Sequence, residues 1–284
     1  MARKEHFIPK LYLKGFLDPN SLRKNNITPY LWCVDVRKGK IRASSTKNIA
    51  KISGFYDYKS YDTSLEDYLT KIESLAAPII EKFRNLDYKI TEEDRFHLSV
   101  YLGLQIGRVP AYRDSIQTAA FKNVKKEINR ILDGNDKNIN VVPPDNFSDY
   151  LIGVSLKVGL DFWTKIVFSM NWIFITPPEE IQFYCTDNPA SLLVPFGSPF
   201  KIDENLQLWF PISPKCALLG QFTDVPDGLV DSVDSEIATS FNLGILPTIQ
   251  RYAFCATKEQ GKWILKHYQG LHQKISGQKE KASV

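Results

Sequence analysis

The chain has 284 residues, of which 43% are hydrophobic, 12% aromatic and 24% charged. This composition excludes a disordered, collagen-like or coiled-coil protein, and the length suits one large domain or two interlocked halves. The 36 basic and 32 acidic side chains leave a net charge of +4, which permits an anionic ligand but lacks the strong basic bias of an obvious nucleic-acid-binding protein.

The N-terminal part of the sequence predicts a short amphipathic segment and a β-hairpin. Residues 6–16 carry the amphipathic pattern, which a turn-forming stretch then ends. Residues 30–36, which are rich in aromatic and β-branched residues, and residues 40–44 are the two expected strands. The Lys38-Gly39 turn between these two runs is typical of a hairpin.

Two amphipathic helices are predicted next, because the apolar residues change from alternation to helical spacing. The first spans residues 62–86, and we expect Pro78 to kink it. The second begins at Thr91, which lies three residues before Asp94 at the spacing of a capping box, and ends at 108 before a proline.

The middle of the chain contains the best candidate for an internal boundary. Helical spacing resumes at residues 112–132, and a polar, proline-containing loop is predicted at 135–146. Residues 148–169 are apolar on most faces and predict the most buried helix.

The second half predicts short strands separated by proline and glycine, with two further helices. The expected strands are 172–176, 182–186, 191–194, 206–210, 217–222 and 252–256, and the expected helices are 231–246, capped by Ser232 or Asp234, and 258–267. We therefore predict an α+β fold, with a helical first half packed on a mixed or antiparallel sheet formed mainly by the second half. We expect a single domain at 1–272, a candidate subdivision near 135–147, and a frayed basic tail at 273–284.

The sequence favours a cytoplasmic protein without membrane association. Lys10 and Lys14 interrupt the apolar residues near the N-terminus, so no signal-peptide core is present. The most apolar stretch, 158–175, contains Asp161 and Lys165 and is expected to be buried in the protein. The cysteines are far apart, form no C-x-x-C pair and are expected to be buried reduced thiols: Cys33, Cys185, Cys216 and Cys255.

Common catalytic motifs are absent from the sequence. It contains no phosphate-binding P-loop, dinucleotide-binding glycine motif, zincin motif or nucleophile elbow. His267 and His272 have no acidic or thiol cluster beside them, so no zinc site is predicted there. The sequence leaves the identity of any cofactor open.

The stretch His6-Phe7-Ile8-Pro9-Lys10-Leu11-Tyr12-Leu13-Lys14-Gly15-Phe16 resembles the opening motif of a bacterial family, domain of unknown function 4238, which has the pattern His-x-x-Pro-x-x-Tyr-Leu-x-x-Phe. The resemblance continues in order over nearly the whole chain. The other matching stretches are Asn48 with Phe55-Tyr56, the helix bearing Glu66 and Glu73, Gln105-x-x-Arg108-x-Pro110, Thr186-Asp187-Asn188-Pro189, Pro211-Ile212-Ser213-Pro214, and Asn242 with Arg251. The resemblance to this family brings no established activity, but it implies which polar residues act together.

A carboxylate and a cation are expected to meet on neighbouring helices. Glu66 and Glu73 are two helical turns apart, on nearly the same face as the apolar stripe, so each needs a polar partner. Arg108, three residues after Gln105, is the natural partner, because a guanidinium holds a carboxylate or a phosphate bidentately. The alternative to a site is a structural Glu–Arg pair that braces two helices.

Four further residues have a functional and a structural interpretation. His6 is either a general acid or base near neutral pH or a cap of its segment. Asp187 and Asn188 form a structured turn at a strand end, where sites are commonly built. Asn242 lies among apolar residues and must bond something in the core or in a site.

Two functions follow from this set. The first is a hydrolase or nuclease acting on a phosphorylated or nucleotide-like substrate, in the setting of a bacterial toxin or antiphage effector. In it His6 is the general acid or base, Arg108 binds the anion and Asp187 orients His6 or holds a divalent ion, while Glu73 is catalytic and Gln105, Asn188, Glu66 and Asn242 bind substrate. The alternative is a non-catalytic module that binds a nucleotide or a partner protein, in which the same residues form a buried structural network.

Overall fold

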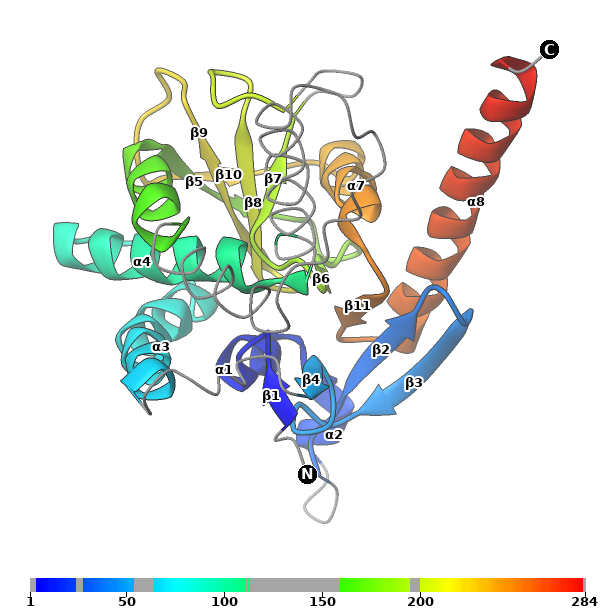
Figure 1. Cartoon of the computed structure of the whole chain (residues 1–284), viewed down its shortest axis with the longest axis horizontal. Coiled ribbons are helices and arrows are strands. Elements are labelled where there is room, and N and C mark those ends of the chain that lie inside the picture. Colours follow the sequence, from blue (N-terminus) through cyan, green and yellow to red (C-terminus); the bar gives the residue numbers. More distant parts are fainter. Residues whose placement is uncertain are drawn as a thin grey trace, which may run out of the picture.

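The computed structural model describes residues 4–23, 28–53, 64–110, 112, 159–194 and 200–282. Helices lie mostly in the first half of the chain and strands mostly in the second half (Figure 1), which confirms the predicted α+β class. The helix predicted at 112–132, apart from residue 112, and the loop predicted at 135–146 lie outside the described residues. Of the helix predicted at 148–169, residues 159–169 are described and are helical. The single domain and its subdivision stay predictions.

The N-terminal segment is anchored by its aromatic residues. Its elements are β1 (Lys4–His6), α1 (Lys10–Leu13), the 3-10 helix η1 (Lys14–Phe16) and α2 (Pro19–Leu22). Tyr12 and Phe16 are fully buried, and the ring of Tyr12 stacks on Phe210 with 4.9 Å between the centroids. The Tyr12 hydroxyl also donates to the carbonyl oxygen of Pro211, so this segment is held against the second half of the chain.

The predicted hairpin forms, and a strand from the C-terminal part of the chain joins it. The antiparallel sheet has the order β3 (Lys40–Ser44), β2 (Leu31–Asp35), β11 (Tyr252–Cys255), β6 (Cys185–Thr186). Gly39 has φ +60° in the turn, a conformation that favours glycine. The predicted strand 182–186 is reduced to the two residues of β6, because only these pair with β11.

The two long helices of the first half are α3 (Ser64–Arg84) and α4 (Glu92–Arg108). Helix α3 continues through Pro78. Helix α4 begins with the predicted capping box, in which Thr91 Oγ1 accepts from the Asp94 amide at 3.0 Å and Asp94 Oδ2 accepts from the Thr91 amide at 3.2 Å. Val109, which precedes a proline, is extended and ends the helix.

The largest sheet is mixed. Its order is β10 (Leu229–Ser232), β5 (Asn171–Thr176), β9 (Cys216–Gln221), β8 (Gln207–Ser213), β7 (Ser191–Leu193). Strand β10 pairs with β5 in parallel, whereas the other neighbours are antiparallel. The helix predicted at 231–246 is therefore wrong at its start. Helix α7 (Ser235–Gly244) begins after Asp234, whose side chain accepts from the Ile237 amide at 2.8 Å, while residues 229–232 pair with β5.

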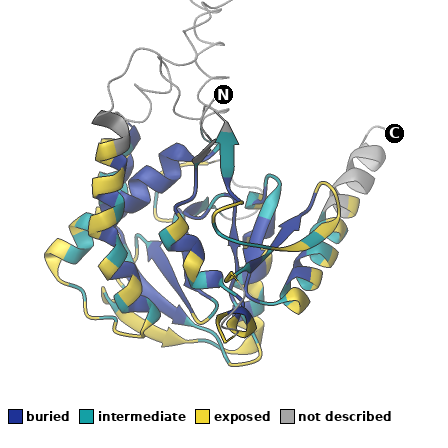
Figure 2. Ribbon diagram, turned by 90° about the horizontal axis from the view of Figure 1, so that it is seen from below, coloured by how far each residue is buried: buried dark blue, intermediate teal, exposed yellow. Residues whose placement is uncertain are grey.

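Alternation along the strands divides the interior into two hydrophobic clusters. On β5, Trp172 and Phe174 face the cluster formed with the first-half helices, whereas Ile173 and Ile175 face the cluster formed with α7 and the C-terminal helix. Buried residues accordingly concentrate in the strands and on the inner faces of the helices (Figure 2). Because successive side chains of a strand point to opposite faces, both faces of the five-stranded sheet present apolar residues, and helices pack on each face.

The last helix, α8 (Lys258–Ala282), is longer than predicted (Figure 1). The expected end at His267 is wrong, because the residues that follow contain no proline and glycine alone does not stop a helix. Fraying of residues 273–284 stays a prediction. Before α8, the 3-10 helix η2 (Leu246–Thr248) connects α7 to β11.

Candidate functional site

Arg108 joins α3, α4 and β1 at one buried junction. Its side chain is 2% exposed, and its guanidinium forms an ion pair of 2.8 Å with Glu73 on α3. It also donates to the carbonyl oxygens of Phe7 at 2.8 Å and His6 at 3.3 Å. The pairing of Glu73 with Arg108 expected from the sequence is therefore present, and this arrangement braces two helices and a strand. We call it the Arg108 junction.

His6 lies at this junction as a neutral ring. It ends β1, which pairs with β4 (Lys51–Ser53), and its Nε2 is 3.2 Å from the carbonyl oxygen of Thr46. Burial lowers the pKa of His6 to about 4, and the nearby cations Lys51, Lys10 and Arg108 act in the same direction. At neutral pH the ring is therefore uncharged and is not the imidazolium that a histidine general acid uses.

Tyr101, Gln105 and Arg108 lie on one face of α4 at spacings of four and three residues. Tyr101 and Gln105 are fully buried. The Tyr101 hydroxyl and both polar atoms of the Gln105 amide make no hydrogen bond in the part of the chain that the structure describes. Glu66 lies on α3 two turns before Glu73, and its side chain lies outside the described residues.

The Asp187 turn is a separate polar site that holds β11. The carboxylate is 6% exposed and accepts from the backbone amides of Gln250, Arg251 and Tyr252 at 2.9, 2.8 and 2.9 Å. Burial raises the pKa of Asp187, and the three amide bonds oppose that shift. The backbone amide of Asn188 donates to Thr186 Oγ1 at 3.0 Å, so Asn188 belongs to the same turn.

The described contacts do not bring His6 and Asp187 together. His6 belongs to the two-stranded sheet, whereas Asp187 follows β6 in the four-stranded sheet. Among the described residues, no hydrogen bond or ion pair joins these two side chains. The structure therefore gives no dyad in which Asp187 orients His6.

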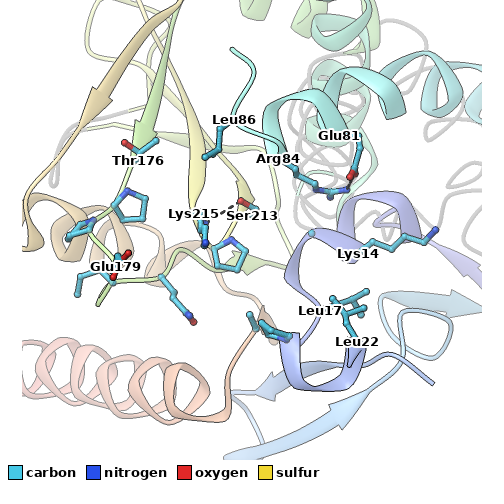
Figure 3. A pocket seen from close by; sticks show the side chains of 18 residues that line it. Lys14, Leu17, Leu22, Glu81, Arg84, Leu86, Thr176, Glu179, Ser213 and Lys215 are labelled. Atoms are coloured by element: carbon cyan, nitrogen blue, oxygen red, sulfur yellow. Dashed lines mark hydrogen bonds and ion pairs between the residues drawn. The ribbon is translucent and has the colours of Figure 1, made fainter. Parts of the chain in front are cut away.

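Three adjacent cavities lie on the side of the molecule where α2, the segment 177–182 and the start of α8 meet. The first is about 970 Å³ and is shown in Figure 3. Its polar lining residues are Lys14, Glu81, Arg84, Thr176, Glu179, Gln182, Ser213 and Lys215. Its apolar and proline walls are Leu17, Pro19, Leu22, Leu86, Pro177, Pro178, Ile181 and Pro214.

The second and third cavities continue from the first. The second is about 340 Å³ and shares Ile181 and Gln182 with the first. The third is about 610 Å³ and shares Thr257 and Glu259 with the second. We call the three together the groove. Of the described residues, His6, Glu73, Arg108 and Asp187 line none of these cavities.

Among the described residues, charges of both signs line the groove in equal number. The cations are Lys14, Arg23, Arg84, Lys215 and Lys258, and the anions are Asp18, Glu81, Glu179, Glu180 and Glu259. The described part of the walls thus has no net charge. An arrangement of this kind does not favour a polyanion.

Arg84 is a central residue of the groove that the sequence analysis missed. In Figure 3 it lies beside Glu81, across the cavity from Thr176 and Glu179. Its guanidinium donates to the carbonyl oxygens of Leu11, Tyr12 and Ile212 at 3.1, 2.8 and 3.4 Å. The family opening motif and the Pro211–Pro214 motif therefore meet through Arg84. Because these three partners are backbone atoms, no sequence pattern could have indicated them, unlike the ion pair of 3.2 Å that Arg84 forms with Glu81 three residues earlier on α3.

Gly15 shows how closely these two motifs approach. A Cβ atom at this position would lie 2.6 Å from the Ile212 carbonyl oxygen and 2.6 Å from an Arg84 nitrogen. The backbone oxygen leaves no space for a side chain, so this packing needs glycine at position 15. Ser213, at the end of β8, is 8% exposed and lines the first cavity.

Asn242, predicted to bind substrate, lines the second cavity. It is 5% exposed, and its side-chain Nδ2 donates to the backbone carbonyl oxygen of Gln182 at 2.9 Å. The backbone carbonyl oxygen of Asn242 accepts from the Tyr184 hydroxyl at 2.8 Å. Its side-chain oxygen makes no hydrogen bond within the described structure. Of the predicted residues whose side chains are described, Asn242 is thus the one that lines the groove. Glu73, Arg108 and the backbone of His6 meet at the Arg108 junction, Gln105 shares the face of α4 that carries Arg108, and Asp187 and Asn188 form their own turn.

The described residues contain no group of three or more histidine, cysteine or acidic side chains able to hold a metal ion. The four cysteines, all within the described residues, are buried and form no disulfide. Burial raises the pKa of Cys33 to about 11 and that of Cys216 to about 12, so both stay protonated at neutral pH. No helix among the described residues has the length and apolar character that a membrane span requires.

Comparison with known proteins agrees with the resemblance seen in the motifs. Residues 4–259 match the family described as "Protein of unknown function (DUF4238)". The chain belongs to this family. The match includes both motifs that Arg84 joins, the Arg108 junction and the Asp187 turn. No curated protein and no solved structure matched the chain.

Proposed function

We propose that this member of the DUF4238 family is a non-catalytic binding module that holds an extended segment of a partner protein in the groove. The observation that carries this proposal is that three cavities share lining residues and together have balanced charge. A series of adjoining cavities suits a chain-like ligand whose successive side chains enter successive cavities.

The composition of the walls favours a peptide over a nucleic acid. Single-stranded nucleic acid is bound along a continuous cationic surface, whereas the groove carries as many anions as cations. Leu22 and Leu86, which line the first cavity, are 59% and 54% exposed. Large apolar side chains that remain exposed beside a groove are typical of protein-binding surfaces.

The buried polar residues support the non-catalytic part of the proposal. Arg108 is engaged by Glu73 and by backbone carbonyls, and Asp187 is engaged by three backbone amides. Groups bonded in this way hold elements of the fold together. They are not poised toward a ligand in the groove.

A hydrolase or nuclease acting on a phosphorylated or nucleotide-like substrate stays the second candidate, and with it a role as a toxin or antiphage effector. One observation favours it, namely that Lys14, Arg84 and Lys215 line the same cavity as the Ser213 hydroxyl. A test is hydrolysis of RNA, DNA and nucleotides by the protein and by a Lys215→Ala variant. Turnover that the variant loses would support this candidate over the binding module.

Site-specific photo-cross-linking tests the binding module. A photoreactive phenylalanine derivative is placed at Leu22 in the groove and, as a matched control, at Phe96, which is 52% exposed and lines none of the three cavities among the described residues. We expect one partner segment to be cross-linked at Leu22 and not at Phe96.

The cross-linked segment is then made as a synthetic peptide, and its affinity for the full chain is measured. We expect Leu86→Glu to weaken that affinity by about tenfold or more, and Phe96→Glu to leave it unchanged, because only the first introduces an unpaired charge into the groove. Equal effects of the two substitutions would contradict the proposal, as would recovery of the same cross-links at both positions.

A further inference from the structure

The second cavity contains two buried side-chain oxygens without a partner. Asn242, from α7, and Gln260, from the first turns of α8, line it together. Asn242 Oδ1 and Gln260 Oε1 are both buried, and neither makes a hydrogen bond in the described structure. Most buried polar atoms in proteins are bonded, so two such acceptors in one cavity need an explanation.

The cause is a single backbone atom that both amides share. Asn242 Nδ2 and Gln260 Nε2 each donate to the carbonyl oxygen of Gln182. That oxygen accepts only, so the NH₂ group of each amide must face it and the orientation of both amides is set. Their carbonyl oxygens are consequently left without a donor, and both side chains line the cavity.

The negative charges that line the second cavity favour a hydrogen-bond donor that is positively charged. Glu180 and Glu259 line the second cavity, and no lysine or arginine appears among the described residues that line it. Lys258, the neighbouring cation, lies 5.6 Å from the ring centroid of Trp32, in the third cavity. The second cavity therefore combines two unpaired acceptors with two carboxylates.

Trp263 adds an aromatic wall to the same cavity. Its ring stacks on His267 with 4.1 Å between the centroids, and this contact holds it in place. Aromatic rings attract organic cations as well as apolar groups. A wall of this kind suits the alkyl stem of a cationic side chain, whose head reaches the oxygens.

We propose that the second cavity is a binding site for the ammonium or guanidinium group of an organic cation. The identity of this cation rests on the proposed function: it is the side chain of a lysine or arginine in the bound partner segment. Both oxygens are buried in the unbound chain, so a small movement of the two amide side chains exposes them. The N–H groups of the cation then donate to Asn242 Oδ1 and Gln260 Oε1, and Glu180 and Glu259 balance its charge.

The test uses three small probes and the full chain. Butylguanidinium and butylammonium carry the cation, whereas butylurea has a similar shape and no charge, and calorimetry with NMR of the tryptophan indole groups reports binding. We expect both cations to bind in the millimolar range or tighter, and butylurea at least about tenfold more weakly, because hydrogen bonds between charged and neutral partners are the stronger ones.

Variants assign the effect to this cavity. The double change Glu180→Gln and Glu259→Gln removes charge at exposed positions, and we expect it to weaken cation binding by about two- to fivefold for each carboxylate. Gln260→Met removes one acceptor and is expected to weaken binding by about tenfold. Glu179→Gln, an adjacent change in the first cavity only, is the matched control and should leave binding unchanged.

The outcomes separate this site from the proposed function. Equal binding of butylguanidinium and butylurea, absence of binding, or equal losses in Glu179→Gln and the double variant would overturn the cation site. A partner peptide that binds the groove equally well after its lysines and arginines are changed to glutamine would also overturn it, while leaving the groove function intact. Cation binding confined to the second cavity, with no peptide bound by the groove, would support the site and remove the proposed function.

Discussion

The Arg108 junction and the second cavity both bury polar side chains, and they differ in how completely the protein itself satisfies them. At the junction, Arg108 contacts Glu73 and two backbone carbonyls. In the second cavity, Asn242 and Gln260 use their donors on one shared carbonyl and leave their oxygens unpaired. A polar residue in an apolar stretch of sequence can therefore have a structural or a binding role. Which of its donors and acceptors are hydrogen-bonded within the protein distinguishes the two roles.

The largest effect is expected where a buried charge loses its partner. Arg108→Met should lower the free energy of unfolding by about 3–5 kcal/mol, because Glu73 is left without its cation and two carbonyls lose a donor. Urea denaturation measures the loss. The matched control is Lys165→Met, which removes the exposed ion pair with Asp161 and should cost less than about 1 kcal/mol. Equal losses would contradict the structural role of the junction.

A somewhat smaller effect is expected at the Asp187 turn. Asp187→Asn keeps the size of the side chain but replaces one acceptor by a donor that faces backbone amides, so we expect a loss of about 2–3 kcal/mol in the free energy of unfolding. Hydrogen exchange of the Gln250, Arg251 and Tyr252 amides should accelerate more than exchange elsewhere. A stable variant with unchanged exchange would show that this carboxylate does not hold β11.

His6 should make stability depend on pH. Its pKa is about 4 when folded and about 6.5 when unfolded, so the unfolded chain binds more protons between these values, and stability should fall as the pH drops from 6.5 to 4. Because the ring is only half-buried, we expect about 1–2 kcal/mol from this residue. The difference between the wild-type curve and that of His6→Gln isolates it from the carboxylates. Parallel curves would contradict the lowered pKa.

The smallest effect on stability is expected in the second cavity. Gln260→Met should change the free energy of unfolding by less than about 0.5 kcal/mol, because the Gln182 carbonyl keeps its bond to Asn242 and one unpaired oxygen disappears. Thermal unfolding of this variant beside Arg108→Met checks the contrast between the two regions. A loss of stability as large as that of the junction variant would show that Gln260 supports the fold as Arg108 does, and would contradict the contrast between the two regions.

Local signals in the sequence were sufficient to predict much of the fold. The Thr91–Asp94 capping box and the Gly39 hairpin depend on residues close together in the chain, and both are present. Strand β10 was missed because its four residues are all exposed and do not alternate, while its pairing partner β5 lies more than fifty residues earlier. Its existence depends on that tertiary contact, which no local pattern records.

The candidate site was predictable only where chemistry requires a partner. A carboxylate on a core-facing helix needs a cation, and the Glu73–Arg108 pair follows from that need. By contrast, Arg84 and Gln260 take part through backbone carbonyls of Ile212 and Gln182. Every residue has such a carbonyl, so sequence alone does not indicate which one a side chain will reach.

The position of β11 between β2 and β6 has a consequence for the order of assembly. During synthesis, β2 leaves the ribosome more than two hundred residues before the strand that covers its inner edge. Until residues 252–255 emerge, that edge carries unpaired backbone groups, which are open to pairing with other nascent chains. The N-terminal hairpin is therefore among the first segments made and among the last to be completed.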